Sequence, residues 1–498
     1  MDPTLTRRTF LSATAAAAAT AALAACSAPP AAGVRILATD PLVAKYEAAR
    51  FWTGATVSPT LSAGQLVADV AGTSVTTWGY NDSLVAPVIR ATVGDQLTAS
   101  VTNRLAEEGT SVHWHGLALR NDADGVPDLT QQMISPGAEY GYQFRLANPG
   151  TYWYHSHVEM QRERALYGAL VIEDPKEALA YDQEWVVVLD DWLDGFGSTP
   201  DAVLAELSHG MMSGMDMGGS SSMLMGSASA YLGGDAGDVR IPVHLINGRS
   251  SLNPDELAST MGDRIRLRII NAAGDTAYRV GVPGQQLTIT HSDGFPVQHQ
   301  NVDAVVLGMG ERIDALLTVE GAKTALLALP EGKAGKVFGV ITTGPGETPS
   351  ESSLPNTLTG TVTDGGRLKA DPSVLLSPKS ADRVHELKLT GSMMNYDWGI
   401  NGRAFNMADP FAGAFEIRMN ERVQVRVVND TMMWHPLHLH GHTFQLAGGG
   451  ARKDTVIVRP MEQVTFEFDA NNPGQWLAHC HNAYHAARGM MSVFSYVK

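Results

Sequence analysis

The sequence predicts an all-β protein built from three related β-sandwich domains. Three segments indicate this, because each has a turn with an acidic residue, a strand in which apolar and polar residues alternate, and a closing asparagine; they are residues 93–103, 261–271 and 419–429. Alternation with a period of two is typical of a strand with one buried face. The closing residues, Asn103, Asn271 and Asn429, lie 168 and 158 positions apart. That spacing is the size of a domain and is too long for a solenoid repeat.

Length and composition agree with this organisation. The 498 residues suit three domains of about 150 residues each, and 44% hydrophobic residues supply full cores. The net charge of −16 argues against a nucleic-acid partner, because phosphate binding needs a basic surface. The only two cysteines, Cys26 and Cys480, exclude a disulfide scaffold. After the N-terminus, no segment has the ~20 apolar residues that span a bilayer.

The N-terminus resembles an export signal. Arg7 and Arg8 precede a modest apolar stretch, as in twin-arginine signals, and the Leu-Ala-Ala-Cys sequence that ends at Cys26 resembles a lipobox. A lipid on Cys26 would be the only membrane attachment. The alternatives are cleavage without a lipid, or a cytosolic protein with an amphipathic or disordered tail. We expect an exported protein of the cell envelope, either lipid-anchored on the outer face of the cytoplasmic membrane or periplasmic or secreted.

Composition shifts predict the domain boundaries. They give a signal (1–26), a Pro/Ala-rich spacer (27–50), domain 1 (51–176), domain 2 (177–345), a linker (346–380) and domain 3 (381–498). The linker is rich in Gly, Pro, Ser and Thr. Helical signals are sparse, and residues 200–208 form the clearest short candidate. Domain 2 also contains a Met-rich insert at 209–225.

The placement of histidines points to a metal cluster. Five His-x-His pairs occur, although random placement of 16 histidines in 498 residues would give fewer than one; they are 113/115, 155/157, 438/440, 440/442 and 479/481. In a strand, residues i and i+2 share a face, so each pair directs two imidazoles to one side. Domains 1 and 3 have matching pairs and domain 2 has none. Hydrogen-bonded core histidines are the alternative, which suits a lone histidine better than duplicated pairs.

Cys480 predicts a second, different metal site. It stands between two of these histidines, and strand alternation turns its sulfur to the opposite face. With His435, His485 and Met490 it makes up two histidines, one cysteine and a weak methionine ligand, the donor set of a blue-copper site. A small buried hydrophobic residue is the alternative interpretation of the cysteine. Zinc is the chemical competitor, but many further histidines without another cysteine favour copper.

These motifs together resemble the four copper signatures of three-domain multicopper oxidases. The matching segments are His113-Trp114-His115-Gly116, His155-Ser156-His157, His435-Pro436-Leu437-His438-Leu439-His440-Gly441, and His479-Cys480-His481 through Met490. The resemblance covers essentially the whole mature chain. It implies three cupredoxin-like Greek-key β-sandwich domains, four copper ions and the reduction of O₂ to water.

The resemblance also implies a ligand for each copper. The type 1 ligands would be His435, Cys480, His485 and Met490; the type 2 ligands His113 and His438; and the type 3 ligands His115, His155, His157, His440, His479 and His481. Electrons would pass through Cys480 to His479 and His481. His442 lies outside the family pattern, and we interpret it as structural.

Proton delivery is less well defined by the sequence. Asp124 matches a family carboxylate that assists proton delivery near the cluster, although a simple turn residue is the alternative. Many bacterial members have an acid directly after the last type 1 histidine, but this chain has Ala486 there. The sequence does not indicate a replacement for that acid.

Methionines suggest a Cu(I) donor. The insert contains Met211, Met212, Met215, Met217, Met223 and Met225, and thioethers are soft ligands that select Cu(I); a flexible insert is the alternative. Met433, two residues before His435, resembles a residue near a cuprous site in copper-resistance members; plain packing is its alternative.

We therefore expect a monomeric multicopper oxidase that takes electrons from Cu(I), from phenols or from both, and that serves copper tolerance. A laccase with phenols as its main substrates is one alternative. A non-catalytic copper-sequestering lipoprotein is another, but such a scaffold should have lost ligands and none is missing.

Overall fold

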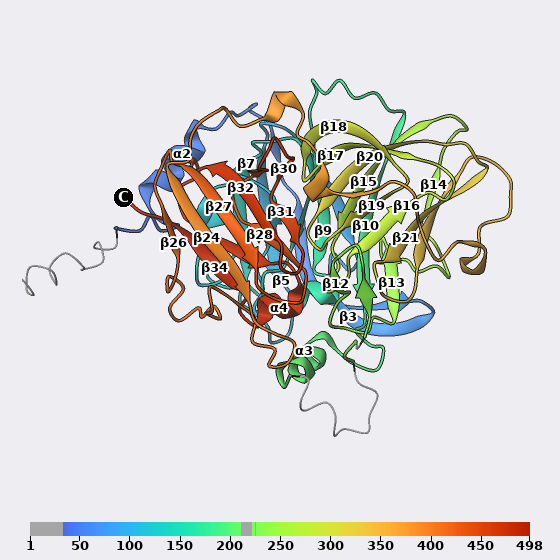
Figure 1. Ribbon diagram of the computed structural model, residues 1–498, viewed down its shortest axis with the longest axis horizontal. Helices are drawn as coiled ribbons and strands as arrows, with labels where there is room; N and C mark the ends of the chain where they lie inside the picture. The colour runs from blue at the N-terminus through green and yellow to red at the C-terminus, as the bar shows by residue number, and fades with distance from the viewer. Residues whose placement is uncertain (1–32, 211–221, 225) are drawn as a thin grey trace, which may run out of the picture.

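The computed structural model describes residues 33–210, 222–224 and 226–498. Within these ranges the chain forms three β-sandwiches in sequence order and three short α-helices (Figure 1). The second sandwich, in green and yellow, lies to the right of the view in Figure 1, and the third, in orange and red, lies to the left. The all-β prediction is confirmed. The predicted signal with Cys26, and every methionine of the Met-rich insert except Met223, lie outside the described residues.

The first sandwich packs a five-stranded sheet against a four-stranded sheet. The larger sheet contains β1 (Thr56–Val57), β2 (Thr60–Val70), β3 (Thr73–Tyr80), β5 (Gln96–Asn103) and β7 (Glu139–Arg145). The smaller sheet has the order β4 (Ala86–Thr92), β9 (Tyr167–Glu173), β8 (Gly150–His155), β6 (His113–His115). Burial alternates along β5, as the sequence predicted, and Leu97 and Val101 of β5 enter a core that also holds Trp114.

The second sandwich consists of two six-stranded sheets. One has the order β13 (Val243–Ile246), β10 (Gln183–Trp192), β15 (Arg264–Asn271), β20 (Arg312–Thr318), β17 (Leu287–Ser292), β18 (Phe295–Val302). The other has the order β14 (Glu256–Ala258), β22 (Val337–Thr342), β21 (Lys323–Pro330), β16 (Tyr278–Gly281), β19 (Ala304–Leu307), β23 (Val362–Asp364). A separate hairpin joins β11 (Ala228–Ser229) to β12 (Gly234–Asp235).

The third sandwich repeats this arrangement with six and five strands. The six-stranded sheet has the order β25 (Gly399–Ile400), β24 (Arg383–Thr390), β27 (Arg422–Asn429), β32 (Gln463–Asp469), β29 (Phe444–Leu446), β30 (Arg452–Lys453). The five-stranded sheet has the order β26 (Phe415–Ile417), β34 (Met491–Tyr496), β33 (Gln475–Cys480), β28 (His435–Leu439), β31 (Thr455–Val458).

One strand pattern recurs in all three sandwiches. The strands that end in the repeated asparagine, β5, β15 and β27, each pair in parallel with an earlier strand (β2, β10, β24) and antiparallel with a later one (β7, β20, β32). The second sheets are equally matched, because β6, β16 and β28 pair antiparallel with β8, β21 and β33. The sequence repeat therefore marks a repeated topology.

The closing asparagine has the same structural role in each domain. In domain 2 the Nδ2 of Asn271 donates to the carbonyl oxygens of Thr276 and Leu307, at 2.9 and 3.0 Å, and its Oδ1 accepts from the amide of Ala273 at 3.1 Å. The buried side chains of Asn103 and Asn429 make the corresponding bonds in domains 1 and 3. Asn271 and Asn429 thus tie the ends of their strands to the facing sheet, at Leu307 of β19 and Val458 of β31, and Asn103 ties its strand end to the loop residues Glu108 and Ile134.

The helices lie outside the sandwiches and have clear capping signals. Asp40 caps α2 (Pro41–Ala49) and Thr199 caps α3 (Pro200–Ser208), each followed by a proline at the first helical position. The third helix, α4 (Ala483–Ala487), begins after Asn482. The prediction of a helix at 200–208 is confirmed. Short 3-10 turns occur at Asn121–Ala123, Gln161–Arg164, Glu351–Ser353, Gly365–Arg367 and Pro372–Val374.

Two segments differ from their predicted roles. The sequence predicted a spacer over 27–50, but residues 33–50 pack on the sandwiches. The amide of the buried Ile36 donates a hydrogen bond to the carbonyl oxygen of Tyr496, and α2 buries the side chain of Val43. Part of the predicted linker, β23, extends a sheet of domain 2. A composition rich in Pro, Ala and Gly does not reveal this packing in either segment, because only a few buried apolar side chains hold each segment against the domains.

We predict that Asn271→Ala lowers the free energy of unfolding of domain 2, and that it does so in the copper-free protein. The substitution leaves an amide and two carbonyl groups without their buried partner, which costs about 2–3 kcal/mol. Urea unfolding of the copper-free protein measures the change. The exposed Asn253→Ala is the control, and equal midpoints for the two variants would contradict the role given to Asn271.

Candidate metal centre

The strand register brings the paired histidines together within each domain. In domain 1, His113 of β6 stands opposite His155 of β8. In domain 3, His438 of β28 stands opposite His479 of β33. The corresponding pair of strands in domain 2, β16 and β21, has Tyr278 opposite Pro330 instead. Domain 2 therefore contributes no histidine at this position.

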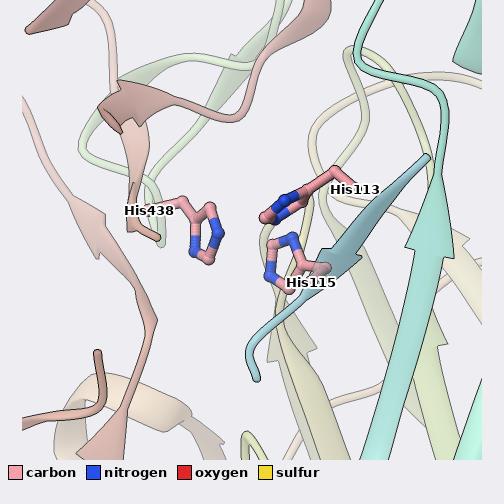
Figure 2. Close-up of side chains that lie close together, drawn as sticks. All are labelled: His113, His115 and His438. Atoms are coloured by element: carbon pink, nitrogen blue, oxygen red, sulfur yellow. The ribbon is translucent and has the colours of Figure 1, made fainter. Parts of the chain in front are cut away.

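Eight histidines from domains 1 and 3 meet between the two sandwiches. Their ring nitrogens form three groups with all atoms within 4.8 Å of one another: His113, His115 and His438; His115, His155 and His481; and His157, His440 and His479. Figure 2 shows the first group, in which the rings from the two domains point toward each other. All eight residues are buried except the half-buried His157.

The free nitrogens of these rings suit metal ions. Five of them are buried without a hydrogen-bond partner: Nε2 of His113, His155, His438 and His481, and Nδ1 of His115. On each of these five rings the other nitrogen has a partner. Burial lowers the pKa of His115, His155, His438 and His481. Burial and the nearby His113 lower the pKa of His157 to about 3. Lone pairs facing a common centre are what copper requires. An oxygen acceptor on the other nitrogen leaves such a lone pair on His113, His115, His155 and His438. On His481 the partner is the Arg162 guanidinium, which only donates.

Asp124 lies directly against this cluster. Its carbonyl oxygen accepts from Nδ1 of His113 at 2.8 Å, and its Oδ2 accepts from Nδ1 of His440 at 2.9 Å. The Oδ1 is buried and has no hydrogen-bond partner. The side chain predicted for proton delivery therefore contacts one histidine from each domain.

A second group consists of His435, Cys480 and His485. The Sγ of Cys480 lies 3.6 Å from Nδ1 of each histidine, and the two Nδ1 atoms lie 3.0 Å apart. All three residues are fully buried, and Cys480 forms no disulfide. Met490 is buried in the same core cluster, and its carbonyl accepts from the amide of Cys480 at 3.0 Å. The structure brings together the four residues predicted for type 1 copper.

Cys480 joins the two groups covalently. It ends β33. Its sulfur lies with His435 and His485, and we call these three residues the mononuclear group. The rings of His479 and His481 belong to the cluster of eight histidines, which we call the trinuclear group. This is the arrangement that strand alternation predicted, because neighbouring side chains point to opposite faces.

Asp238 of domain 2 positions His485. Its Oδ2 accepts from Nε2 of His485 at 2.9 Å and from the hydroxyl of Tyr396 at 2.6 Å. Burial alone would lower the pKa of His485, but Asp238 and Cys480 outweigh it and raise that pKa to about 10. The bond to Asp238 leaves Nδ1 facing Cys480. The sequence analysis missed Asp238 and Tyr396, and no local pattern marks either residue.

Three further side chains around the cluster were also missed. Nη1 of Arg162 lies 2.9 Å from Nδ1 of His481. The buried Asp454 contacts His115 and His438, and Arg312 contacts Asp454. Burial would raise the pKa of Asp454, but the Arg312 guanidinium lowers it below the ordinary value.

The remaining predicted residues lie as follows. Met433 is buried in the core cluster that contains Cys480 and Met490, and Met223 belongs to the same cluster. His442 lies beside the cluster: its Nδ1 lies 3.1 Å from the carbonyl oxygen of His440 and its Nε2 lies 2.7 Å from the hydroxyl of Tyr496, and burial lowers its pKa to about 4.

A cavity of about 510 Å³ reaches the trinuclear group. His155, His157 and His479 lie in its wall together with Phe405 and Ala486. The small side chain at position 486, where the sequence lacked an acid, therefore borders open space beside the cluster.

Comparison with known proteins identifies the class. Three family models described as multicopper oxidase match residues 64–177, 379–498 and 184–326, so the chain belongs to the multicopper oxidase family, enzymes that use type 1, type 2 and type 3 copper. A relative from Mycobacterium tuberculosis, Multicopper oxidase MmcO, is 42% identical and aligns with 91% of this chain and 89% of its own length. A Copper resistance protein A homolog from Pseudomonas syringae pv. tomato is 26% identical over 86% of this chain and 90% of its own length.

Solved structures agree on the fold. The L499M mutant of the laccase from B. aclada has a TM-score of 0.73 at 24% identity and covers 90% of this chain and 88% of its own. Fet3p, a multicopper oxidase that functions in iron import, has a TM-score of 0.71 at 21% identity and covers 89% of this chain and 90% of its own. The three cupredoxin-like sandwiches are thereby confirmed. In the described part of the chain, no helix is long and apolar enough to cross a membrane.

We predict a pH-dependent stability that comes from Glu163, beside Arg162. Burial raises the pKa of Glu163 from 4.5 to about 8; Arg162 opposes this rise, and Asp191 and Asp275 add to it. The folded chain therefore holds a proton that the unfolded chain releases above pH 4.5, and the free energy of unfolding falls as the pH rises between these two values. In the wild type, Glu163 should lower the free energy of unfolding by up to ~1.4 kcal/mol for each pH unit in this window, and Glu163→Gln should lack this contribution.

Urea unfolding of the copper-free protein at several pH values in this window tests the effect. Exposed Glu320→Gln is the matched control and should follow the wild type. Parallel pH curves for Glu163→Gln and the wild type would show that Glu163 does not hold the proton.

Proposed function

We propose that this multicopper oxidase is an exported cuprous oxidase that uses O₂ to convert Cu(I) to Cu(II) in copper tolerance. The observation behind the donor is that Met433 and Met223 lie in the core cluster around Cys480. Their thioethers are soft donors of the kind that select Cu(I), and they belong to the same buried core as Cys480. Relatives named copper resistance protein A support the same role.

We assign the ligands as the sequence predicted. Type 1 copper would be held by His435, Cys480, His485 and Met490; type 2 copper by His113 and His438; and the type 3 pair by His115, His155, His157, His440, His479 and His481. The unpartnered ring nitrogens support this set. When bound, copper supplies one-electron oxidation of the donor and four-electron reduction of O₂.

The protein's own residues keep the two centres close and correctly oriented. The backbone from Cys480 to each neighbouring histidine is a short covalent connection between them. Asp124 is the candidate for holding a proton beside the cluster, because its Oδ2 accepts from His440 while its Oδ1 has no partner. The cavity beside His157 and His479 offers space for O₂ to approach.

Access to the mononuclear group favours a metal donor over a phenol. An aromatic donor would have to touch the edge of His435 or His485, but both rings are fully buried, and Asp238 occupies the Nε2 side of His485. A laccase activity on phenols remains the second candidate, since relatives named laccase match over most of the chain. Export and a lipid on Cys26 are further parts of this proposal, and the N-terminal sequence supports them. A monomeric state completes the proposal.

We expect Cys480→Ser to abolish the blue colour and the oxidase activity, because a hydroxyl oxygen does not replace the copper–thiolate bond. The fold should persist, since the two side chains are nearly equal in size. Visible absorption and O₂ uptake of the copper-loaded protein measure the effect. Cys26→Ser removes the only other cysteine and should remain blue. A blue, active Cys480→Ser protein would refute the type 1 assignment.

We expect Met433→Leu to slow Cu(I) oxidation about tenfold, equivalent to ~1.4 kcal/mol in the barrier, with little effect on a phenol. Leucine conserves the buried volume but offers no thioether. Steady-state rates with both donors, in fully copper-loaded protein, test this. The matched control is Met261→Leu at an exposed turn of domain 2. Equal proportional losses for the two donors would return the laccase function to first place.

A further inference from the structure

Domain 2 provides no ligand, yet one of its side chains reaches the trinuclear group. Arg312, at the start of β20, is fully buried. Its Nη1 donates to Oδ1 of Asp454 at 2.7 Å, and its Nη2 donates to Oδ2 at 2.6 Å. Two parallel bonds of this kind fix the plane of a carboxylate, which a single bond from lysine does not do.

Asp454 transmits this orientation to two histidines. Its Oδ1 lies 3.1 Å from Nε2 of His115, and its carbonyl oxygen lies 2.9 Å from Nδ1 of His438. The hydroxyl of Thr455 lies within 3.2 Å of both rings and donates to Oδ1 of Asp454 at 2.9 Å. The rings of His115 and His438 are stacked, with centroids 3.8 Å apart.

His115 depends on this contact more than the other rings do. Among the five unpartnered nitrogens of the cluster it presents Nδ1, whereas the other four rings present Nε2. A neutral imidazole has one N–H, so a free Nδ1 lone pair requires the proton on Nε2. The carboxylate oxygen facing Nε2 supplies the acceptor for that proton.

The chain leaves room for the pair. A Cβ on Gly116, directly after His115, would lie 2.5 Å from Nη2 of Arg312 and 2.7 Å from Oδ2 of Asp454. Asp293 of domain 2 anchors the other side, because its Oδ1 accepts from the amide of Arg312 at 2.9 Å and its Oδ2 from the amide of Asp454 at 3.2 Å. Three segments from three domains are therefore shaped around one ion pair.

We propose that Arg312 is a positioning residue that acts through Asp454 to hold His115 with its Nδ1 lone pair directed at the cluster. Domain 2 thereby completes a copper site to which it gives no ligand. This inference rests on the ligand assignment of the proposed function.

The test compares Arg312→Lys and Arg312→Gln with the wild type. Loss of a side chain that orients a ligand typically weakens metal binding about 10- to 100-fold. We expect the dissociation constant of the trinuclear coppers to rise by that factor. The type 2 electron paramagnetic resonance signal should also weaken, because His438, which we assign to type 2 copper, contacts the same Asp454. The blue type 1 absorption should stay at full strength, since His435, Cys480 and His485 do not contact Arg312.

Arg266→Lys is the matched control. Arg266 is an equally buried arginine of domain 2 that pairs with Asp314 and Glu177, away from the histidines. Its variant should bind all coppers as the wild type does. An unchanged type 2 signal and affinity in both Arg312 variants would overturn the proposal, as would the same copper loss in Arg266→Lys, which would make the effect one of general packing.

A second measurement uses the wild type alone, so it does not depend on the folding of a variant. Nitrogen NMR of the copper-free wild type should find the His115 proton on Nε2, and a proton on Nδ1 would overturn the proposal. The outcomes stay separate from those of the proposed function: a wild type without blue colour or type 2 signal rejects the copper assignment itself, whereas normal Arg312 variants of a blue wild type reject only the positioning role.

Discussion

The structure depends on keeping a group of imidazole rings neutral, buried and pointed at one another. Each ring must offer one lone pair to the centre and satisfy its other nitrogen within the protein. Backbone carbonyl oxygens of Asp124, Ser156, Asp454 and Cys480 do this for four of the eight rings, those of His113, His155, His438 and His479. The interface between domains 1 and 3 is consequently a polar core, and it holds together only if strands from both domains keep their register.

Domain 2 contributes charge and orientation to this core. Arg312, Asp454, Asp293, Lys453 and Glu311 form a fully buried ionic network where domains 2 and 3 meet. Burying such ions is costly, and the attraction between them returns little net stability. Their value lies in geometry, because paired charges accept few alternative arrangements. The second sandwich thus shares the topology of its neighbours and supports histidines of domains 1 and 3.

The mononuclear group is enclosed in a comparable way. Asp238 comes from the segment that follows the Met-rich insert, and it fixes His485 from the side opposite Cys480. Asn482 begins α4 and accepts from the amide of His485, which sets the helix that presents this ring. The enclosure keeps the Cys480 sulfur away from water.

The sequence by itself determined everything that has a local period. Alternation gave the half-buried strands that end at Asn103, Asn271 and Asn429, and the i, i+2 spacing gave paired imidazoles with the Cys480 sulfur on the other face. Only the tertiary structure showed that α2 packs on the sandwiches, that β23 extends a sheet of domain 2, and that Arg312 and Asp238 act on histidines. These last contacts join residues 142 and 247 positions apart, from Arg312 to Asp454 and from Asp238 to His485. No local pattern records such a pairing, because it exists only once three separate domains have packed together.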